Sequence, residues 1–121
     1  MTPYEAGYLE GTTGDACEQS KAEHEGRAWV YDPHRHAEAR AKIQAWYQTP
    51  EGVACKAQQD EIVRLETLVL TEKATAEDIA AYRLAKESPP WSEFNRGIEA
   101  AADKQVAELM DWLFARKGVQ S

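Results

Sequence analysis

Residues typical of helix starts and helix ends recur along this chain, and they constrain its fold more than any other feature. Asp32-Pro33 and Thr49-Pro50 each place an N-cap residue before a proline. Proline is tolerated in the first helical position because its missing N–H would have no intrahelical partner there. We therefore predict helices over residues 33–48 and 50–70.

The second half of the chain carries the same kind of signal. Thr75 and Asp78 have the spacing of a capping box, in which two side chains bond two backbone N–H groups, so a helix is expected over 76–87. Ser88-Pro89-Pro90 ends that helix. A long helix follows over about 90–117, where basic residues and a glycine mark its end.

Residues 1–31 are expected to be less regular. Gly11-Thr12-Thr13-Gly14 predicts a turn, and Asp15 can cap a short polar helix that reaches Glu25. Residues 27–31 are predicted to be extended or to form a tight connection.

Composition agrees with a single helical domain over residues 1–121, which is long enough to bury a core. Twenty of the residues are alanine, which has the highest helix propensity but little surface to bury. Four Trp and five Tyr supply much of the remaining bulk. We predict an all-α fold, a compact bundle of four or more helices, with a lead segment over 1–31 and a helical core over 32–118.

Helical periodicity predicts which faces are buried. The last helix has one apolar stripe, made of Phe94, Ile98, Ala101, Ala102, Val106, Leu109, Trp112 and Leu113. The main apolar face of the 50–70 helix is made of Ala54, Cys55, Ile62, Leu65, Leu68 and Val69. Val63 and Leu70 form a second stripe roughly opposite, so this helix should lie centrally or contact a partner. The residues expected to be buried together are Trp112, Leu109, Ile98, Leu65, Ile62 and Ile43.

His34 and His36 raise the question of a metal site. In a helix over 33–48 they would point about 200° apart and could not bind one ion, because each step turns the helix by about 100°. His36 would instead share the buried face with Ile43. No pair of histidines or cysteines has the short spacing typical of zinc ligands, so neither a metal nor another cofactor is expected.

The two cysteines are expected to be reduced thiols, although a Cys17–Cys55 bridge stays open at this point. Cys55 falls on an apolar face, which favours a role as a small core residue. The sequence contains no glycine-rich phosphate loop, nucleophile elbow or metalloprotease helix. The chain is therefore not expected to be an enzyme.

Charge is unevenly spread along the chain, whose net charge is −7. Residues 1–26 contain six acids against Lys21, whereas residues 27–48 contain four basic residues against two acids. The sequence therefore predicts an acidic lead segment followed by a basic helix.

These features indicate a non-enzymatic protein-binding module, an inhibitor or adaptor that occupies a basic, nucleic-acid-binding surface of a partner protein. Clustered carboxylates steer association with such surfaces and can compete with phosphate. Affinity would come from aromatic side chains outside the core stripes. The candidate partner-binding residues are Tyr4, Tyr8, Glu18, Glu23, Glu25, Trp29, Tyr31 and Trp91.

The alternative is a small DNA-binding regulator. Residues 75–100 read as helix, proline turn, helix, so Ser92, Asn95 and Arg96 could begin a recognition helix, with the basic 27–42 stretch as a second contact. The acidic flanks weigh against this alternative because they repel phosphate.

In size, acidity and absence of motifs, the chain resembles small acidic phage accessory proteins, including anti-CRISPR proteins that block a host nucleic-acid-binding complex. The resemblance implies an inhibitor that acts by occupying a surface, and it rests on no alignable motif. Over eight residues, Tyr4-x-x-Gly7-Tyr8-x-x-Gly11 also looks like the start of ribosome modulation factor-like sequences. The chain shows neither a signal peptide nor the run of about 20 apolar residues that a membrane span needs, so a cytoplasmic location is expected.

Overall fold

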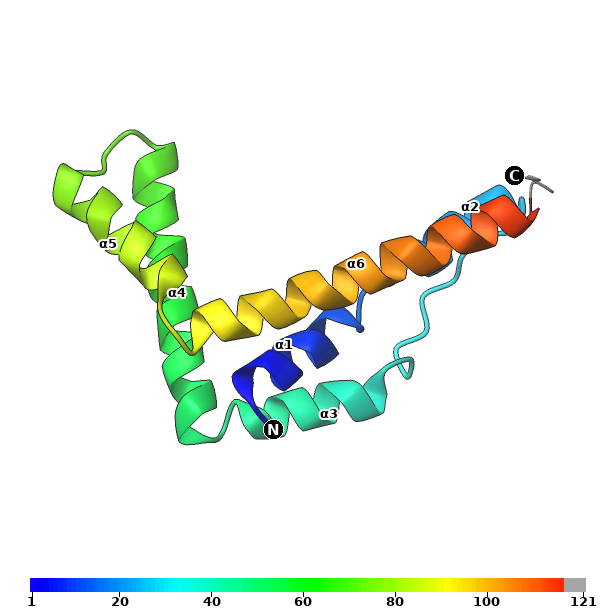
Figure 1. Ribbon diagram of the computed structural model, residues 1–121, viewed down its shortest axis with the longest axis horizontal. Coiled ribbons are helices and arrows are strands. Elements are labelled where there is room, and N and C mark those ends of the chain that lie inside the picture. The colour runs from blue at the N-terminus through cyan, green and yellow to red at the C-terminus, as the bar shows by residue number, and fades with distance from the viewer. Residues whose placement is uncertain (117–121) are drawn as a thin grey trace.

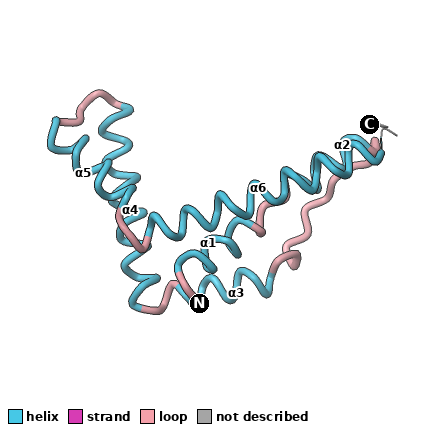
Figure 2. Tube along the Cα trace, viewed as in Figure 1, coloured by secondary structure: helices cyan, strands magenta, loops and turns pink. Residues whose placement is uncertain are grey.

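The computed structural model describes residues 1–116 and consists of six α-helices with their connections (Figures 1 and 2). The helices are α1 (Pro3–Gly11), α2 (Ala16–His24), α3 (Ala37–Trp46), α4 (Pro50–Leu70), α5 (Ala76–Glu87) and α6 (Trp91–Arg116). Within the described residues there is no strand, so the predicted all-α bundle of four or more helices is confirmed. None of these helices is long and apolar enough to cross a membrane.

The helices α4 and α5 have the predicted bounds, and their caps explain why. The Thr49 hydroxyl accepts a hydrogen bond from the Gly52 N–H at 3.1 Å, which satisfies one free donor in the first turn of α4. At the start of α5, Thr75 and Asp78 bond each other's backbone N–H groups at 3.1 and 2.9 Å. The capping box predicted there is present.

The predicted start of α3 is wrong by four residues, because the chain turns before the helix begins. Asp32 accepts the His34 N–H on its side chain at 2.9 Å and the Arg35 N–H on its carbonyl at 3.1 Å. His36 then adopts a left-handed conformation with φ of 64°, which interrupts the helical hydrogen-bond pattern. The prediction that His34 and His36 lie on opposite faces of a helix is therefore wrong, since both histidines precede α3. The end of α3 also falls two residues before the predicted Gln48.

Residues 1–31 are more regular than predicted, because they contain two helices. Thr2 and Glu5 form a capping box that starts α1, with hydrogen bonds of 3.1 and 2.9 Å. The short polar helix predicted after Asp15 is present as α2, although the Asp15 side chain makes no capping hydrogen bond. The connection over residues 27–31 is non-helical, as predicted.

Glycines let α1 and α6 cross in backbone contact, and α1 lies along the first half of α6 in Figure 1. A Cβ atom on Gly7 would lie 1.8 Å from the carbonyl oxygen of Phe94, and one on Gly97 would lie 2.2 Å from that of Tyr4. A Cβ on Gly11 would lie 2.7 Å from the Ala101 side chain. Small residues four apart on both helices thus permit this approach, which increases the number of close interatomic contacts.

The core lies where α1, α3, α4 and α6 meet. Its fully buried members are Ala6, Trp46, Cys55 and Phe94, and Tyr47, Trp91 and Ile98 pack against them. The Trp46 and Phe94 rings stack with centroids 5.6 Å apart and planes 10° from parallel. Aromatic residues therefore replace the large aliphatic residues that this alanine-rich chain lacks.

The predicted set of core residues is correct in part. Ile43, Ile62 and Leu65 are buried, whereas Ile98, Leu109 and Trp112 are only partly buried. Ile98 packs against the cluster of Trp46 and Phe94, but the six residues do not all form one cluster. The stripe predicted on α6 is also correct in part. Phe94 and Ala101 are buried as predicted, but Ala102 and Val106 are exposed, and Gly97, which lay outside the predicted stripe, is buried. Gly97 faces α1, and the hydrophobic pattern could not detect it because glycine has no side chain.

The helices α4 and α5 form a hairpin that stands away from α6 (Figure 1). Gln58 of α4 links this hairpin to the connection between α5 and α6. Its side chain donates to the Ser88 carbonyl at 3.1 Å and accepts the Trp91 N–H at 3.0 Å. No residue of α5 is buried. Val63 and Leu70, the predicted second stripe, are exposed.

Candidate functional site

The aromatic candidates lie in three different places. Tyr4 and Tyr8 lie four residues apart on α1 and line the same hollow. Trp29 and Tyr31 contact each other in the connection between α2 and α3, with ring centroids 6.2 Å apart. Trp91 packs against Phe94 at the edge of the core, with its indole nitrogen buried. The structure therefore does not bring these five residues together.

The acidic candidates lie on and just after α2, and basic residues approach two of them. Glu18 lies 3.6 Å from Lys21 and 3.8 Å from Arg35, and Glu25 lies 3.2 Å from Arg27. Glu23 is exposed, and no ion pair involves it within residues 1–116. Of the three, Glu23 alone presents a carboxylate that no neighbouring cation balances.

A polar cluster joins the acidic and basic regions of the sequence. The Asp15 carboxylate lies 3.4 Å from Arg35 Nε and 3.5 Å from His36 Nε2, and Arg35 Nε donates to His36 Nε2 at 3.0 Å. The left-handed backbone at His36 turns its side chain toward this cluster. Its role is structural, since it ties the connection before α3 to the start of α2.

The charge segregation seen in the sequence is therefore reduced in the folded chain. Arg27 and Arg35 pair with acids of residues 1–26, and Lys42 pairs with Glu38 on its own helix at 3.4 Å. Exposed pairs of this kind contribute little stability, but they cancel much of the local field. The predicted basic helix does not present a continuous positive surface.

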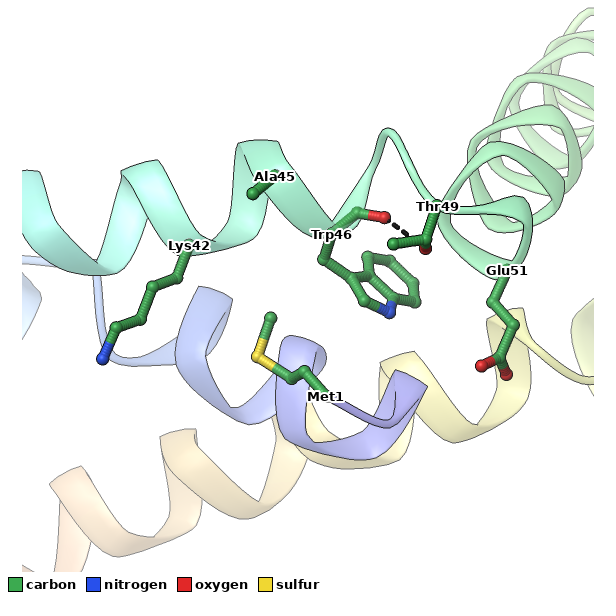
Figure 3. Close-up of a pocket in the computed structure, with 6 residues that line it drawn as sticks. All are labelled: Met1, Lys42, Ala45, Trp46, Thr49 and Glu51. Carbon is green, nitrogen blue, oxygen red and sulfur yellow. Dashed lines mark hydrogen bonds between the residues drawn. The ribbon is translucent and has the colours of Figure 1, made fainter.

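Two adjoining hollows lie along α1 and α3. One hollow of about 410 Å³ is lined by Met1, Lys42, Ala45, Trp46, Thr49 and Glu51 (Figure 3). A second hollow of about 480 Å³ is lined by Met1, Tyr4, Glu5, Tyr8, Leu9 and Lys42. They share Met1 and Lys42, so we treat them as one surface, the α1–α3 groove.

Trp46 gives this groove a polar feature within an apolar wall. The residue is only 4% exposed, and its indole nitrogen has no hydrogen-bond acceptor within residues 1–116. In Figure 3 this nitrogen points toward the gap between Met1 and Glu51. A buried donor without an acceptor costs free energy.

The charged rim of the groove is mixed in sign. Glu5 and Glu51 supply carboxylates, and Lys42 supplies an ammonium group. The Thr2 backbone N–H donates to Glu5 and lowers the pKa of its carboxyl group, so this carboxylate is charged at neutral pH. The groove therefore combines an aromatic and aliphatic floor with acids at two positions.

Few features of the described residues support a reactive thiol or a metal site. Both cysteines are free, so the Cys17–Cys55 bridge does not form. Burial raises the pKa of the Cys55 thiol, which makes it a poor nucleophile at neutral pH. Burial also raises the pKa of Tyr47. No group of His, Cys, Asp or Glu in residues 1–116 has an arrangement that could hold a metal ion.

Comparison with known proteins gives no relative. No family model matches the chain, and neither a curated protein nor a solved structure matches it.

Sequence reasoning named Tyr4 and Tyr8 but missed the rest of the groove. Met1, Lys42, Ala45 and Trp46 belong to segments that meet only in the folded chain. Trp46 is buried at the wall of the groove. The pattern could not show that its indole nitrogen would lack an acceptor.

Proposed function

We propose that this protein is a non-enzymatic protein-binding module that takes a segment of another protein into the α1–α3 groove. The observation that carries the proposal is the apolar groove with a buried, unpartnered Trp46 N–H at its wall. Binding energy at protein interfaces concentrates in a few buried aromatic and aliphatic contacts. Tyr4, Tyr8 and Trp46 supply such contacts within one surface.

The chemistry of the groove indicates what the segment should contain. An apolar side chain would cover Met1 and the Tyr8 ring. A basic side chain next in the segment would reach Glu5 or Glu51. We therefore propose a partner with an apolar residue adjacent to Arg or Lys.

A basic surface that binds nucleic acid is the partner class that fits best. Such surfaces are rich in Arg and Lys, and the net charge of −7 steers association toward them. Glu23 adds a carboxylate on α2 that no cation of residues 1–116 pairs. Occupation of such a surface would make the protein an inhibitor or adaptor, in the manner of the small phage inhibitors that the chain resembles.

The DNA-binding alternative receives less support from the geometry. The start of α6 is packed against the molecule, since Phe94 and Gly97 are buried, and Asn95 donates its amide to Glu99 at 3.3 Å. Ser92 and Asn95 are half-buried, which leaves Arg96 as the exposed residue of the three. A recognition helix needs several neighbouring exposed side chains.

The test is to compare two arginine substitutions on α3. Ala45→Arg fills the groove with a charged side chain at an exposed position that lines it, whereas Gln44→Arg adds the same charge on another face. A partner is first captured from a lysate with the wild-type protein, and its affinity for purified wild type and both variants is then measured.

We expect Ala45→Arg to raise the dissociation constant by at least about tenfold, which corresponds to about 1.4 kcal/mol. Gln44→Arg should leave it unchanged, and added salt should weaken wild-type binding. Equal affinities for all three proteins would contradict the proposal.

A further inference from the structure

A further hollow adjoins the α1–α3 groove, because Glu51 lines both. This hollow of about 430 Å³ lies where the start of α4 meets the connection from α5 to α6. In Figure 3 the Glu51 side chain extends from α4 toward the start of α6. We call this space the proline hollow, and its lining residues are Pro50, Glu51, Ala54, Pro89, Pro90 and Glu93.

Hydrogen bonds and aromatic packing fix the two sides of the proline hollow relative to each other. Gln58 of α4 bonds Ser88 and Trp91, the residues on either side of Pro89-Pro90, at 3.1 and 3.0 Å. The Trp91 ring in turn packs against Phe94 of the core, with centroids 5.9 Å apart. Proline also has a fixed φ, so this wall loses little conformational freedom when a ligand binds.

The wall of the proline hollow suits an alkyl chain. Three prolines and an alanine form it, and Pro50, Ala54 and Pro89 are exposed, so a ligand can reach them. Long basic side chains bury their methylene stems against apolar surface of this kind and keep the charged head in water. The wall can therefore hold the stem of an arginine or a lysine.

Two carboxylates border the hollow without a cation. None of the lining residues is basic, and within residues 1–116 no ion pair involves Glu51 or Glu93. The other charges of the groove are already engaged. Glu5 accepts the Thr2 N–H at 2.9 Å, and Lys42 pairs with Glu38 at 3.4 Å. The Glu51 end of the groove is therefore the end with uncompensated negative charge.

Helix electrostatics explain only part of this arrangement. Glu51 and Glu93 lie in the first turns of α4 and α6, where a carboxylate interacts favourably with the helix dipole. That interaction accounts for one acid on each helix. It does not require both acids to border the same apolar hollow, and this combination is complementary to a cation with an alkyl stem.

We propose that the proline hollow is a second subsite for the segment bound in the α1–α3 groove, and that it takes an arginine side chain. The methylene stem lies on the prolines, and the guanidinium group bonds Glu51 and Glu93. Arginine is favoured over lysine because its planar guanidinium group has five donors and can bond two carboxylates at once. This inference rests on the proposed function, and it selects Glu51 over Glu5 as the partner of the basic side chain.

Two capped dipeptides test the subsite with the full chain. The probes are N-acetyl-leucyl-argininamide and N-acetyl-leucyl-citrullinamide, since citrulline has nearly the shape of arginine but no charge. Chemical-shift titration gives the dissociation constant of each peptide. The wild type should bind the arginine peptide at least about threefold more tightly, because ion pairs that stay partly in solvent give modest gains.

Glu51→Gln and Glu93→Gln each remove one carboxylate and keep the side-chain shape. Each should reduce the preference for the arginine peptide and leave the affinity for the citrulline peptide unchanged. Asp103→Asn is the matched control, because it removes a charge from an exposed position of α6 that lines neither hollow. It should keep the wild-type preference, and circular dichroism should show equal helicity for all variants.

The outcomes separate this subsite from the groove itself. Equal binding of both peptides by the wild type, with both weakened by Ala45→Arg, would overturn the subsite and leave the proposed function standing. A preference for arginine that survives in both Gln variants, or is lost in Asp103→Asn, would also overturn the subsite. If neither peptide bound at millimolar concentration, the groove and the subsite would both be overturned.

Discussion

The crossing of α1 with α6 and the hairpin of α4 with α5 are both pairs of helices, but they are built by opposite means. At the crossing, Gly7 and Gly97 bring two backbones into contact, and the neighbouring Phe94 is buried. In the hairpin, longer side chains separate the helices, and α5 buries none of its residues. The crossing is packed from within the chain, whereas the hairpin has one face without a partner.

This difference indicates where stability and binding reside. Close backbone packing tolerates no added atoms, so the crossing should form the rigid platform of the molecule. A helix with few buried contacts opens locally at low cost, so α5 should open more readily than the crossing. The α1–α3 groove lies on the platform side, which gives a ligand a preformed surface to bind.

The largest expected effect is at the crossing. Gly97→Ala should destabilise the fold by about 4 kcal/mol or more, because the new methyl group would overlap backbone atoms of α1 that cannot move aside. Helix propensity alone would predict that Gly97→Ala stabilises the fold by about 1 kcal/mol, which is the opposite sign. Urea denaturation followed by circular dichroism measures the difference.

Gly14→Ala provides the control for this substitution, because no atom lies within 4 Å of the added Cβ. Its effect should stay within about 0.5 kcal/mol. If Gly97→Ala were equally mild, the two helices would not be in backbone contact.

A second comparison uses two leucines of the hairpin helices. Leu65 is 1% exposed, so Leu65→Ala should cost about 3 kcal/mol from lost burial and the cavity left behind. Leu84→Ala should cost less than about 0.5 kcal/mol, because that side chain is already in solvent. Thermal unfolding measures both. Similar costs would show that α5 is packed on both sides.

The smallest effect concerns the capping boxes that start α1 and α5. Hydrogen bonds from the backbone N–H groups of Thr2 and Thr75 lower the pKa of Glu5 and of Asp78 respectively. A lowered folded-state pKa adds stability that is present above the unfolded value, near 4.5 for Glu5, and is lost as pH falls through the folded value.

Glu5→Gln removes this titration while keeping a hydrogen-bond acceptor. The stability difference between the wild type and Glu5→Gln should therefore be present at pH 7 and should vanish at pH values below the folded pKa. Denaturation across this range measures it. A difference that does not change with pH would show that the charge of Glu5 plays no part in the cap.

Local signals predicted much of the fold, because caps depend on residues close in sequence. Thr49-Pro50 and the Thr75–Asp78 pair gave the bounds of α4 and α5. The start of α3 was missed because His36 turns toward Asp15, which is a tertiary contact. The burial of Gly97 on α6 was missed because its backbone packs against α1 and glycine carries no hydrophobic signal.

The candidate site was less predictable, since it depends on segments that meet only in the folded chain. Tyr4 and Tyr8 were visible as aromatic residues outside the expected core. Their position opposite Lys42 and Ala45 could not be predicted, because it depends on the packing of α1 against α3. The acidic lead segment was visible too, but its pairing with Arg27 and Arg35 was not.

Amide hydrogen exchange tests most directly whether the crossing is a stable platform and the hairpin is not. Amides of residues 94–101 should exchange only through global unfolding. Amides of α5 should exchange at least about a hundredfold faster, through local opening. Equal protection of α5 and residues 94–101 would contradict the account, because α5 would then be as stable as the crossing.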